Sequence, residues 1–315
     1  MNVAVQLLFL VIGFVMLVKG ADWFVEGASK VAEKFGIPQL VIGLTIVAIG
    51  TSLPEAAVST SAALKGSAEI TIGNVVGSNI MNVLLILGVT SVISPLAVQK
   101  STIKYELPMV IGATVLLAFL GLFDGTVGRI DGIILLAGLV LYLLYLLRMA
   151  RKGQAAAEEQ ERGQTEKSDN MLKLVLFILV GGVMIVWGSD ITVDAATELA
   201  RIFGMSERLI GLTIVAFGTS LPELVTSATA ALKGKADIAV GNIVGSNLFN
   251  ILFVVGIAAA ITPVVYEAAF FIDTIVCIAT AVLLWVCVIR KQKLARGGGV
   301  ILLVGYAGYF LYLMH

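Results

Sequence analysis

Two stretches of this chain carry nearly the same sequence, and they constrain its fold more than any other feature. Residues 42–88 begin with IGLTIVAIGTSLPE, and residues 210–256 begin with IGLTIVAFGTSLPE. Aligned at a constant offset of 168 and without a gap, 30 of the 47 positions are identical. Each copy places a Pro-Glu pair inside an apolar segment. The sequence therefore predicts two similar halves, each with a polar feature at its centre.

The composition is typical of an integral membrane protein. Of the 315 residues, 59% are hydrophobic and only 13% are charged, whereas about a quarter of a soluble domain is charged. The formal net charge is zero, so no bulk field attracts nucleic acid. The expected partners are the lipid bilayer and small solutes, and no obligate protein partner is indicated.

Ten apolar spans follow one another, most of them close to the roughly 20 residues that a membrane-crossing helix needs. They lie near residues 2–19, 38–64, 70–94, 106–123, 130–147, 172–188, 206–232, 238–262, 268–289 and 299–314. A polar stretch divides the chain into a first five-helix repeat (1–147), a linker (148–171) and a second five-helix repeat (172–315). We predict an all-α integral membrane protein with ten transmembrane helices.

The basic residues predict the orientation, because cytoplasmic loops carry an excess of Lys and Arg. With the N-terminus and the C-terminus both outside, seventeen Lys and Arg residues fall on the cytoplasmic side and four on the outer side. The linker is then cytoplasmic, and the protein lies in the cell (inner or plasma) membrane. Because five helices per half is an odd number, the halves cross the membrane in opposite senses. Such inverted-topology repeats are typical of secondary transporters, whose sites lie near the midplane.

The Pro-Glu pair brings polar groups to the centre of each repeat. Pro54 has no N–H and clashes with the carbonyl of Gly50, so the helix is expected to loosen and leave carbonyls from Ala48 to Thr51 without helical partners. Glu55 lies four residues after Thr51 and shares its helix face. The second copy repeats this pattern with Ala216, Gly218, Thr219, Ser220, Pro222 and Glu223.

A carboxylate at the bilayer centre costs at least about 2.5–3.5 kcal/mol. Two of them in equivalent positions are expected to converge on a bound cation. The alternative interpretation is that each Glu is a hydrogen-bonding group in helix packing.

Each repeat continues with a polar stripe. Asn74, Ser78 and Asn82 recur every four residues, and the second copy has Asn242, Ser246 and Asn250. These side chains are either further oxygen ligands or polar contacts between helices.

All the candidate ligands are oxygens, which disfavours Cu and Zn. Ca²⁺ takes six to eight such oxygens, whereas Mg²⁺ prefers to keep its waters. Na⁺ uses similar neutral oxygens, so a site with two carboxylates can hold Ca²⁺ or several Na⁺ but not all at once. Mutually exclusive binding is the physical basis of exchange. No cofactor and no catalytic residue is expected, because Ser52 or Thr51 beside Glu55 makes a poor nucleophile–base pair.

The doubled GTSLPE motif, followed each time by G-N-x-V-G-S-N, resembles the two alpha-repeats of the sodium/calcium exchanger family, in the calcium/cation antiporter superfamily, and indicates a prokaryotic member. The resemblance implies Na⁺-driven Ca²⁺ efflux by a ten-helix protein whose ions bind between the second, third, seventh and eighth helices. By matching position, it implies the metal ligands Ala48 and Ala216 (through their carbonyls), Thr51, Ser52, Glu55, Ser78, Asn82, Thr219, Ser220, Glu223, Ser246 and Asn250.

One departure from the family pattern leaves the monovalent ion open. Some relatives carry Asp where this chain has Asn82 or Asn250, and here both positions are amides. A proton-coupled or K⁺-dependent Ca²⁺/cation antiporter is therefore the alternative function. A cation channel is a further alternative, but inverted repeats with interrupted helices favour alternating access.

Overall fold

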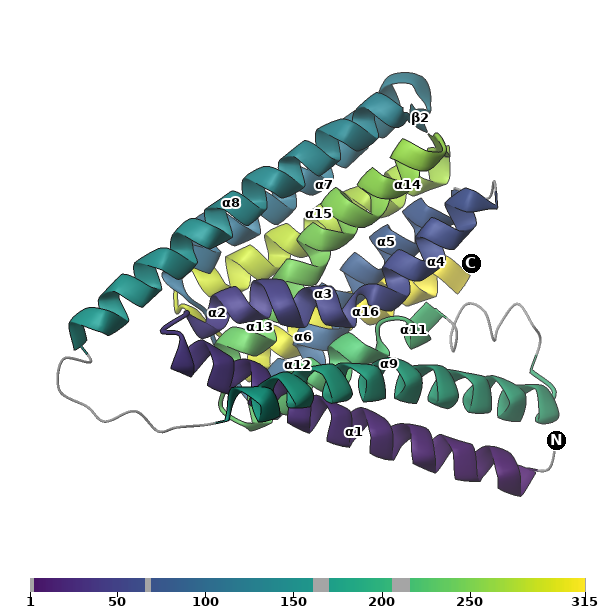
Figure 1. The fold of residues 1–315 in the computed structure, drawn as a ribbon. Helices are drawn as coiled ribbons and strands as arrows, with labels where there is room; N and C mark the ends of the chain where they lie inside the picture. The colour runs from purple at the N-terminus through teal and green to yellow at the C-terminus, as the bar shows by residue number, and fades with distance from the viewer. Residues whose placement is uncertain (1–2, 66–68, 161–169, 206–215, 315) are drawn as a thin grey trace.

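The computed structural model describes residues 3–65, 69–160, 170–205 and 216–314, and nearly all of them are helical (Figure 1). The first half contains α1 (Val3–Lys34), α2 (Gln39–Ile42), η1 (Gly43–Val47), α3 (Ala48–Thr51), α4 (Leu53–Leu64), α5 (Glu69–Met81), η2 (Asn82–Ile86), α6 (Leu87–Ile93), β1 (Leu96–Ala97), η3 (Thr102–Glu106), α7 (Leu107–Asp124), β2 (Thr126–Val127) and α8 (Arg129–Gln160). The second half contains α9 (Met171–Ile202), α11 (Ala216–Gly218), α12 (Leu221–Leu232), α13 (Ala236–Phe249), η5 (Asn250–Val255), α14 (Gly256–Ile261), β3 (Val264–Val265), α15 (Ala268–Ile289), β4 (Lys293–Leu294) and α16 (Arg296–Met314). The η elements are π-helical.

The internal repeat extends well beyond the duplicated motif. The bounds of α1 and α9, of α4 and α12, and of β1 and β3 differ by 168 at both ends. This is the offset that aligns the two GTSLPE segments. Both halves of the chain therefore fold in the same way, and each site residue has a structural equivalent in the other half.

Helices α1 and α9 pack against each other in opposite directions. Gly13 of α1 lies against Gly188 of α9, and Gly20 lies against Gly181. A Cβ atom added to Gly20 would lie 2.9 Å from the Gly181 carbonyl oxygen, and one added to Gly181 would lie 2.7 Å from the Gly20 carbonyl oxygen. Glycine therefore permits the close approach of the two backbones. Because α1 and α9 are equivalent helices that run antiparallel, the two repeats are inverted.

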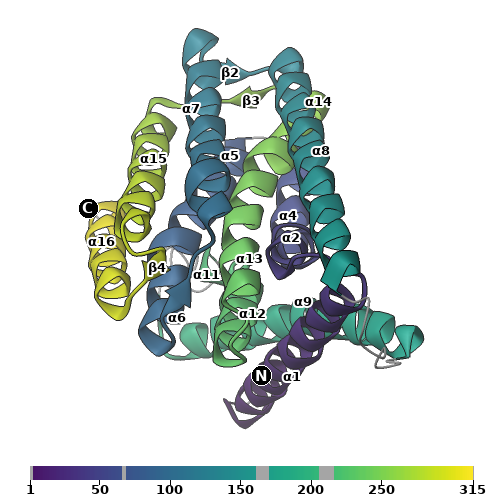
Figure 2. The ribbon, with the colours of Figure 1, turned by 90° about the vertical axis from the view of Figure 1, so that its left-hand side faces the viewer.

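These two helices are longer than the sequence predicts. Each has 32 residues, which is about 48 Å of helix and exceeds the roughly 30 Å hydrocarbon core. Figure 2 shows them crossing the other helices at a steep angle. The predicted ends near residues 19 and 188 are wrong: the charged residues after Lys19 lie on one face of α1, while Ala21, Val25 and Ala28 on its other face are buried.

Two short strand pairs tie the repeats together. β1 pairs with β4 in antiparallel register, with Leu96 opposite Leu294. β2 pairs with β3, with Val127 opposite Val264, at one end of the bundle (Figure 2). Each pair joins one strand from each half, so neither half forms its small sheet alone.

The predicted fold class is confirmed. Among the described residues, eight helices are long and apolar enough to span a membrane, and the bent pair Gln39–Thr51 and Leu53–Leu64 adds a ninth span. The equivalent tenth span is predicted near 206–232, where residues 206–215 lie outside the described part, and α11 and α12 match α3 and α4. Helix α8 continues to Gln160, so the first part of the predicted linker is helical, and residues 161–169 lie outside the described part.

Candidate cation site

Each GTSLPE motif forms a break between two short helices. At Ser52 the backbone leaves helical geometry (φ −87°, ψ 9°), and α4 is bent by 49° from the segment before it. Ser220 has nearly the same conformation in the second half (φ −90°, ψ 3°). Proline is the second residue of the new helix in both cases, and Glu55 and Glu223 lie in its first turn. The positive end of the helix dipole there favours a carboxylate.

The Ala48 carbonyl is not free in the way the proline predicts. It accepts the backbone N–H of Ser52 at 3.0 Å, so the expectation of an unpaired carbonyl at this position is wrong. Ser246 Oγ from the other repeat lies 3.4 Å from the same oxygen. The break lies at Ser52, because Pro54 lacks the N–H that would bond to the Gly50 carbonyl and leaves the bond to the Ala48 carbonyl intact.

The two glutamates are fully buried and are held by serines from both repeats. Glu223 Oε1 accepts hydrogen bonds from Ser52 Oγ at 2.9 Å and from Ser246 Oγ at 3.4 Å. Glu55 Oε1 accepts from Ser220 Oγ at 3.4 Å and lies 3.5 Å from Ser78 Oγ. Each carboxylate therefore bonds to one hydroxyl of its own repeat and one of the other. The inverted symmetry brings both to one place.

Four buried oxygens of the predicted ligands have no hydrogen-bond partner among the described residues. They are Glu55 Oε2, Glu223 Oε2, Asn82 Oδ1 and Asn250 Oδ1. They form two pairs related by the repeat. No ion pair within the described residues includes either glutamate. A buried carboxylate without a compensating charge is strongly unfavourable, and such oxygens are what hard cations prefer.

The structure brings together most of the residues predicted from the sequence. Ten of them form hydrogen bonds across the repeats, either with one another or with Asn79, Asn242 or Asn247: Ala48, Thr51, Ser52, Glu55, Ser78, Asn82, Ser220, Glu223, Ser246 and Asn250. Thr219 instead lines a cavity, and Ala216 is the first residue of α11. Sequence reasoning assigned no role to Asn79 and Asn247, although both belong to the duplicated GSN tripeptide.

Equivalent contacts on the two sides of the site differ. Thr51 Oγ1 lies 2.9 Å from Asn242 Oδ1, and both residues are fully buried. Their equivalents, Thr219 and Asn74, are half-buried and form no such bond. A cavity of about 490 Å³ lies on that side, lined by residues that include Pro54, Thr219, Asp190 and Asp194. The site is therefore closed on one side and approached by a cavity on the other.

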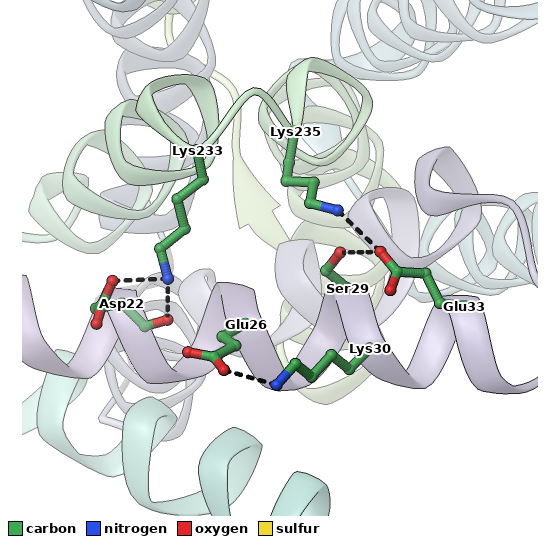
Figure 3. A network of polar contacts seen from close by, with 7 residues as sticks. All are labelled: Asp22, Glu26, Ser29, Lys30, Glu33, Lys233 and Lys235. Carbon is green, nitrogen blue, oxygen red and sulfur yellow. Dashed lines mark hydrogen bonds and ion pairs between the residues drawn. The ribbon is translucent and has the colours of Figure 1, made fainter. Parts of the chain in front are cut away.

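The ion pairs also differ between the closed side and the side with the cavity (Figure 3). Lys233, in the loop between α12 and α13, lies 2.6 Å from Asp22 Oδ1 of α1 and also donates to the Asp22 carbonyl at 2.8 Å. Lys235 pairs with Glu33 at 2.9 Å. The equivalents of Asp22 and Lys233 are Asp190 and Lys65, which form no ion pair with each other. On the closed side, ion pairs therefore hold the loop between α12 and α13 against α1. On the other side, the equivalent pair of described residues is not in contact in this way.

Residues 5–148 and 173–315 match the sequence profile of the family described as sodium/calcium exchanger protein. The chain belongs to the sodium/calcium exchanger family. This exchanger-family chain is 38% identical over 306 residues to the inner membrane protein YrbG of Escherichia coli, covering 94% of the chain and 93% of the relative. It is 32% identical over 349 residues to the sodium/calcium exchanger MaX1 of Methanosarcina acetivorans, covering 99% of both.

A solved structure shows that the fold of this exchanger-family chain is shared along its length. The sodium-calcium exchanger NCX_Mj, soaked with zero Na⁺ and Ca²⁺, superposes with a TM-score of 0.85 at 29% identity. The match covers 99% of this chain and 100% of NCX_Mj. The resemblance inferred from the doubled GTSLPE motif is confirmed. The exchanger-family protein is thus a multi-pass membrane protein of a transporter family.

Proposed function

We propose that this protein is a secondary active antiporter that exchanges Na⁺ for Ca²⁺ across the membrane. The observation that carries the proposal is the pair of fully buried carboxylates, Glu55 and Glu223, each with one oxygen that has no partner among the described residues. Together they supply a formal charge of −2, which one Ca²⁺ balances. The relatives named sodium/calcium exchangers, MaX1 and NCX_Mj, support the same assignment.

The proposed binding site combines these carboxylates with neutral oxygens from both repeats. Its members are Ala48, Thr51, Ser52, Glu55, Ser78, Asn82, Ala216, Thr219, Ser220, Glu223, Ser246 and Asn250. Hydroxyl, amide and carbonyl oxygens suit Na⁺ and complete the six to eight ligands of Ca²⁺. Since both ions need the carboxylates, they compete for the same oxygens.

We propose that the ions reach this site by alternating access. The contacts that close one side, Thr51–Asn242 and Asp22–Lys233, have equivalents on the other side that are not formed. Because the repeats are inverted, closing the second set while opening the first moves the access path across the membrane. The two states then differ mainly in which of the two equivalent sets of contacts is formed.

We further propose that the protein lies in the cell membrane with both termini outside. The excess of Lys and Arg then falls on the cytoplasmic side, with the Lys233–Asp22 clamp on that side and the cavity facing outward. The name of the relative YrbG, an inner membrane protein, agrees with this location.

The test is uptake of ⁴⁵Ca²⁺ into Na⁺-loaded proteoliposomes, with external Na⁺, K⁺ and pH varied in turn. We expect uptake that depends on the outward Na⁺ gradient and falls as external Na⁺ rises. Uptake that is independent of Na⁺ and driven by a pH gradient would replace this proposal with proton-coupled exchange. An absolute requirement for K⁺ would indicate the K⁺-dependent alternative.

A further inference from the structure

Four asparagines form a hydrogen-bonded network at the proposed site, in which Asn82 and Asn250 each bond to one member of a reciprocal Asn79–Asn247 pair. Asn79 and Asn82 come from α5 and the start of η2, and Asn247 and Asn250 come from α13 and the start of η5. Asn79 Nδ2 donates to the Asn247 carbonyl at 3.1 Å, and Asn247 Nδ2 donates to the Asn79 carbonyl at 3.3 Å. All four side chains are buried. The first two bonds join the equivalent helices of the two repeats.

The remaining bonds cross the repeats a second time. Asn82 Nδ2 donates to Asn247 Oδ1 at 3.0 Å, and Asn250 Nδ2 donates to Asn79 Oδ1 at 3.1 Å. Both polar atoms of the Asn79 side chain, and both of the Asn247 side chain, thereby form hydrogen bonds within the network. Asn82 and Asn250 each keep one free atom, the amide oxygen.

The direction of these bonds is fixed by the two backbone carbonyls. A carbonyl can only accept, so the Asn79 and Asn247 amides must present nitrogen to it. The Asn247 oxygen then faces Asn82 and the Asn79 oxygen faces Asn250, so Asn82 and Asn250 must donate from their amide nitrogens. If Asn82 were flipped, its oxygen would meet the oxygen of Asn247, and flipping Asn247 in turn would place an oxygen against a carbonyl. The network therefore holds the free Oδ1 atoms of Asn82 and Asn250 in one orientation.

A purely structural network gives no reason for leaving two buried oxygens unpaired, since each costs about 1–3 kcal/mol. Both belong to residues of the proposed cation site, four residues after Ser78 and Ser246, whose hydroxyls lie 3.5 Å and 3.4 Å from the glutamate Oε1 atoms. We propose that Asn79 and Asn247 are positioning residues, which turn the amide oxygens of Asn250 and Asn82 toward the transported cation. This inference rests on the proposed function.

The arrangement also couples the two halves of the protein. Asn79 of the first repeat orients a ligand of the second, and Asn247 of the second orients a ligand of the first. Neither repeat can set the direction of its own amide. The π-helical segments that begin at Asn82 and Asn250 place these side chains at the contact between the repeats, and such local widening is frequent at functional sites.

The test is a double-mutant cycle on Ca²⁺ binding. In the parent, Asn79→Leu removes the acceptor of Asn250 Nδ2, so the amide can turn its nitrogen toward the cation. We expect Ca²⁺ affinity to fall by about 10- to 100-fold, as for other groups that orient a metal ligand. In the Asn250→Asp background the same substitution should change affinity by less than about threefold. The reason is that a carboxylate presents an oxygen in either orientation.

Affinity is measured by equilibrium ⁴⁵Ca²⁺ binding to the full-length purified protein, alongside its thermal unfolding midpoint. A contact that only joins helices would lower affinity equally in both backgrounds, and that result, or unchanged affinity in the parent, overturns the inference. If Asn79→Leu does not fold, Asn79→Ser removes the same acceptor without adding an apolar group. A parent protein that binds no Ca²⁺ refutes the proposed function itself. A parent that binds Ca²⁺ normally, with no selective loss in the variant, refutes the positioning role alone.

Discussion

Breaking the Lys233–Asp22 ion pair should open the closed side of the protein more often. Lys233 and Asp22 side chains are 30% and 40% exposed, so the pair is partly screened by solvent. Pairs of this kind contribute about 0.2–1 kcal/mol, and we take the upper end because the ammonium also bonds to the Asp22 carbonyl at 2.8 Å. About 1 kcal/mol is about a fivefold change in the ratio of closed to open molecules. Lys233→Gln should therefore raise the open fraction up to about fivefold.

The assay uses a matched pair of cysteine probes on the two sides. Thr226 on α12 is fully buried, whereas its equivalent Val58 on α4 is 43% exposed and lines the cavity. In a background with Cys277 and Cys287 replaced, a water-soluble maleimide should label Thr226→Cys up to about five times faster when Lys233→Gln is present. Labelling of Val58→Cys should not accelerate, because that side is already accessible. The acceleration at position 226 should shrink at high salt, which screens partly exposed charges.

The equivalent lysine supplies the control. Lys65 forms no ion pair with Asp190 in this state, so Lys65→Gln should not accelerate labelling at Thr226→Cys. If Lys233→Gln leaves that labelling rate unchanged at low salt, or if Lys65→Gln raises it equally, the clamp does not hold the side closed. The reasoning from the asymmetry of the ion pairs would then be refuted.

The remaining predictions concern the site and the topology. Glu55→Gln and Glu223→Gln should each nearly abolish ⁴⁵Ca²⁺ uptake without lowering the unfolding midpoint, because each removes a charge from a desolvated Ca²⁺ site; near-parental uptake by either variant would contradict the paired-carboxylate site. A cysteine at Gly125 should label from outside and one at Ala156 only from the cytoplasm, and the opposite pattern would reverse the orientation. Asn250→Asp adds a third carboxylate, and like-charge repulsion should make one group hold a proton. Exchange between about pH 6 and 8 should then become more pH-sensitive or newly dependent on K⁺, and superimposable profiles would show that residue 250 does not face the ions.

The sequence alone predicts the parts of this protein that depend on local chemistry. A chain with so few charges must lie in lipid, and a motif that recurs at an offset of five spans, an odd number, must cross the membrane in the opposite sense. Proline and glutamate inside an apolar segment predict a broken helix with a buried carboxylate. No neighbouring side chain can replace the N–H that proline lacks or supply a positive charge to the carboxylate. The pairing of Glu55 with Ser220, and of Glu223 with Ser52, follows once inverted repeats meet at the midplane.

Only the tertiary structure decided the features that depend on contacts between the halves. Helix α1 extends past Lys19 because its charged face has partners in the other half. Asp22 pairs with Lys233 and Glu33 pairs with Lys235, some 200 residues away in the sequence. The role proposed for Asn79 cannot be predicted from the sequence either. An asparagine next to a ligand in the sequence could bind an ion, join helices or orient a neighbouring side chain, and the sequence does not distinguish these roles. Nor does a symmetric sequence determine which side is closed. In the described part of the chain, the Thr51–Asn242 and Asp22–Lys233 contacts are formed and those between their equivalents are not.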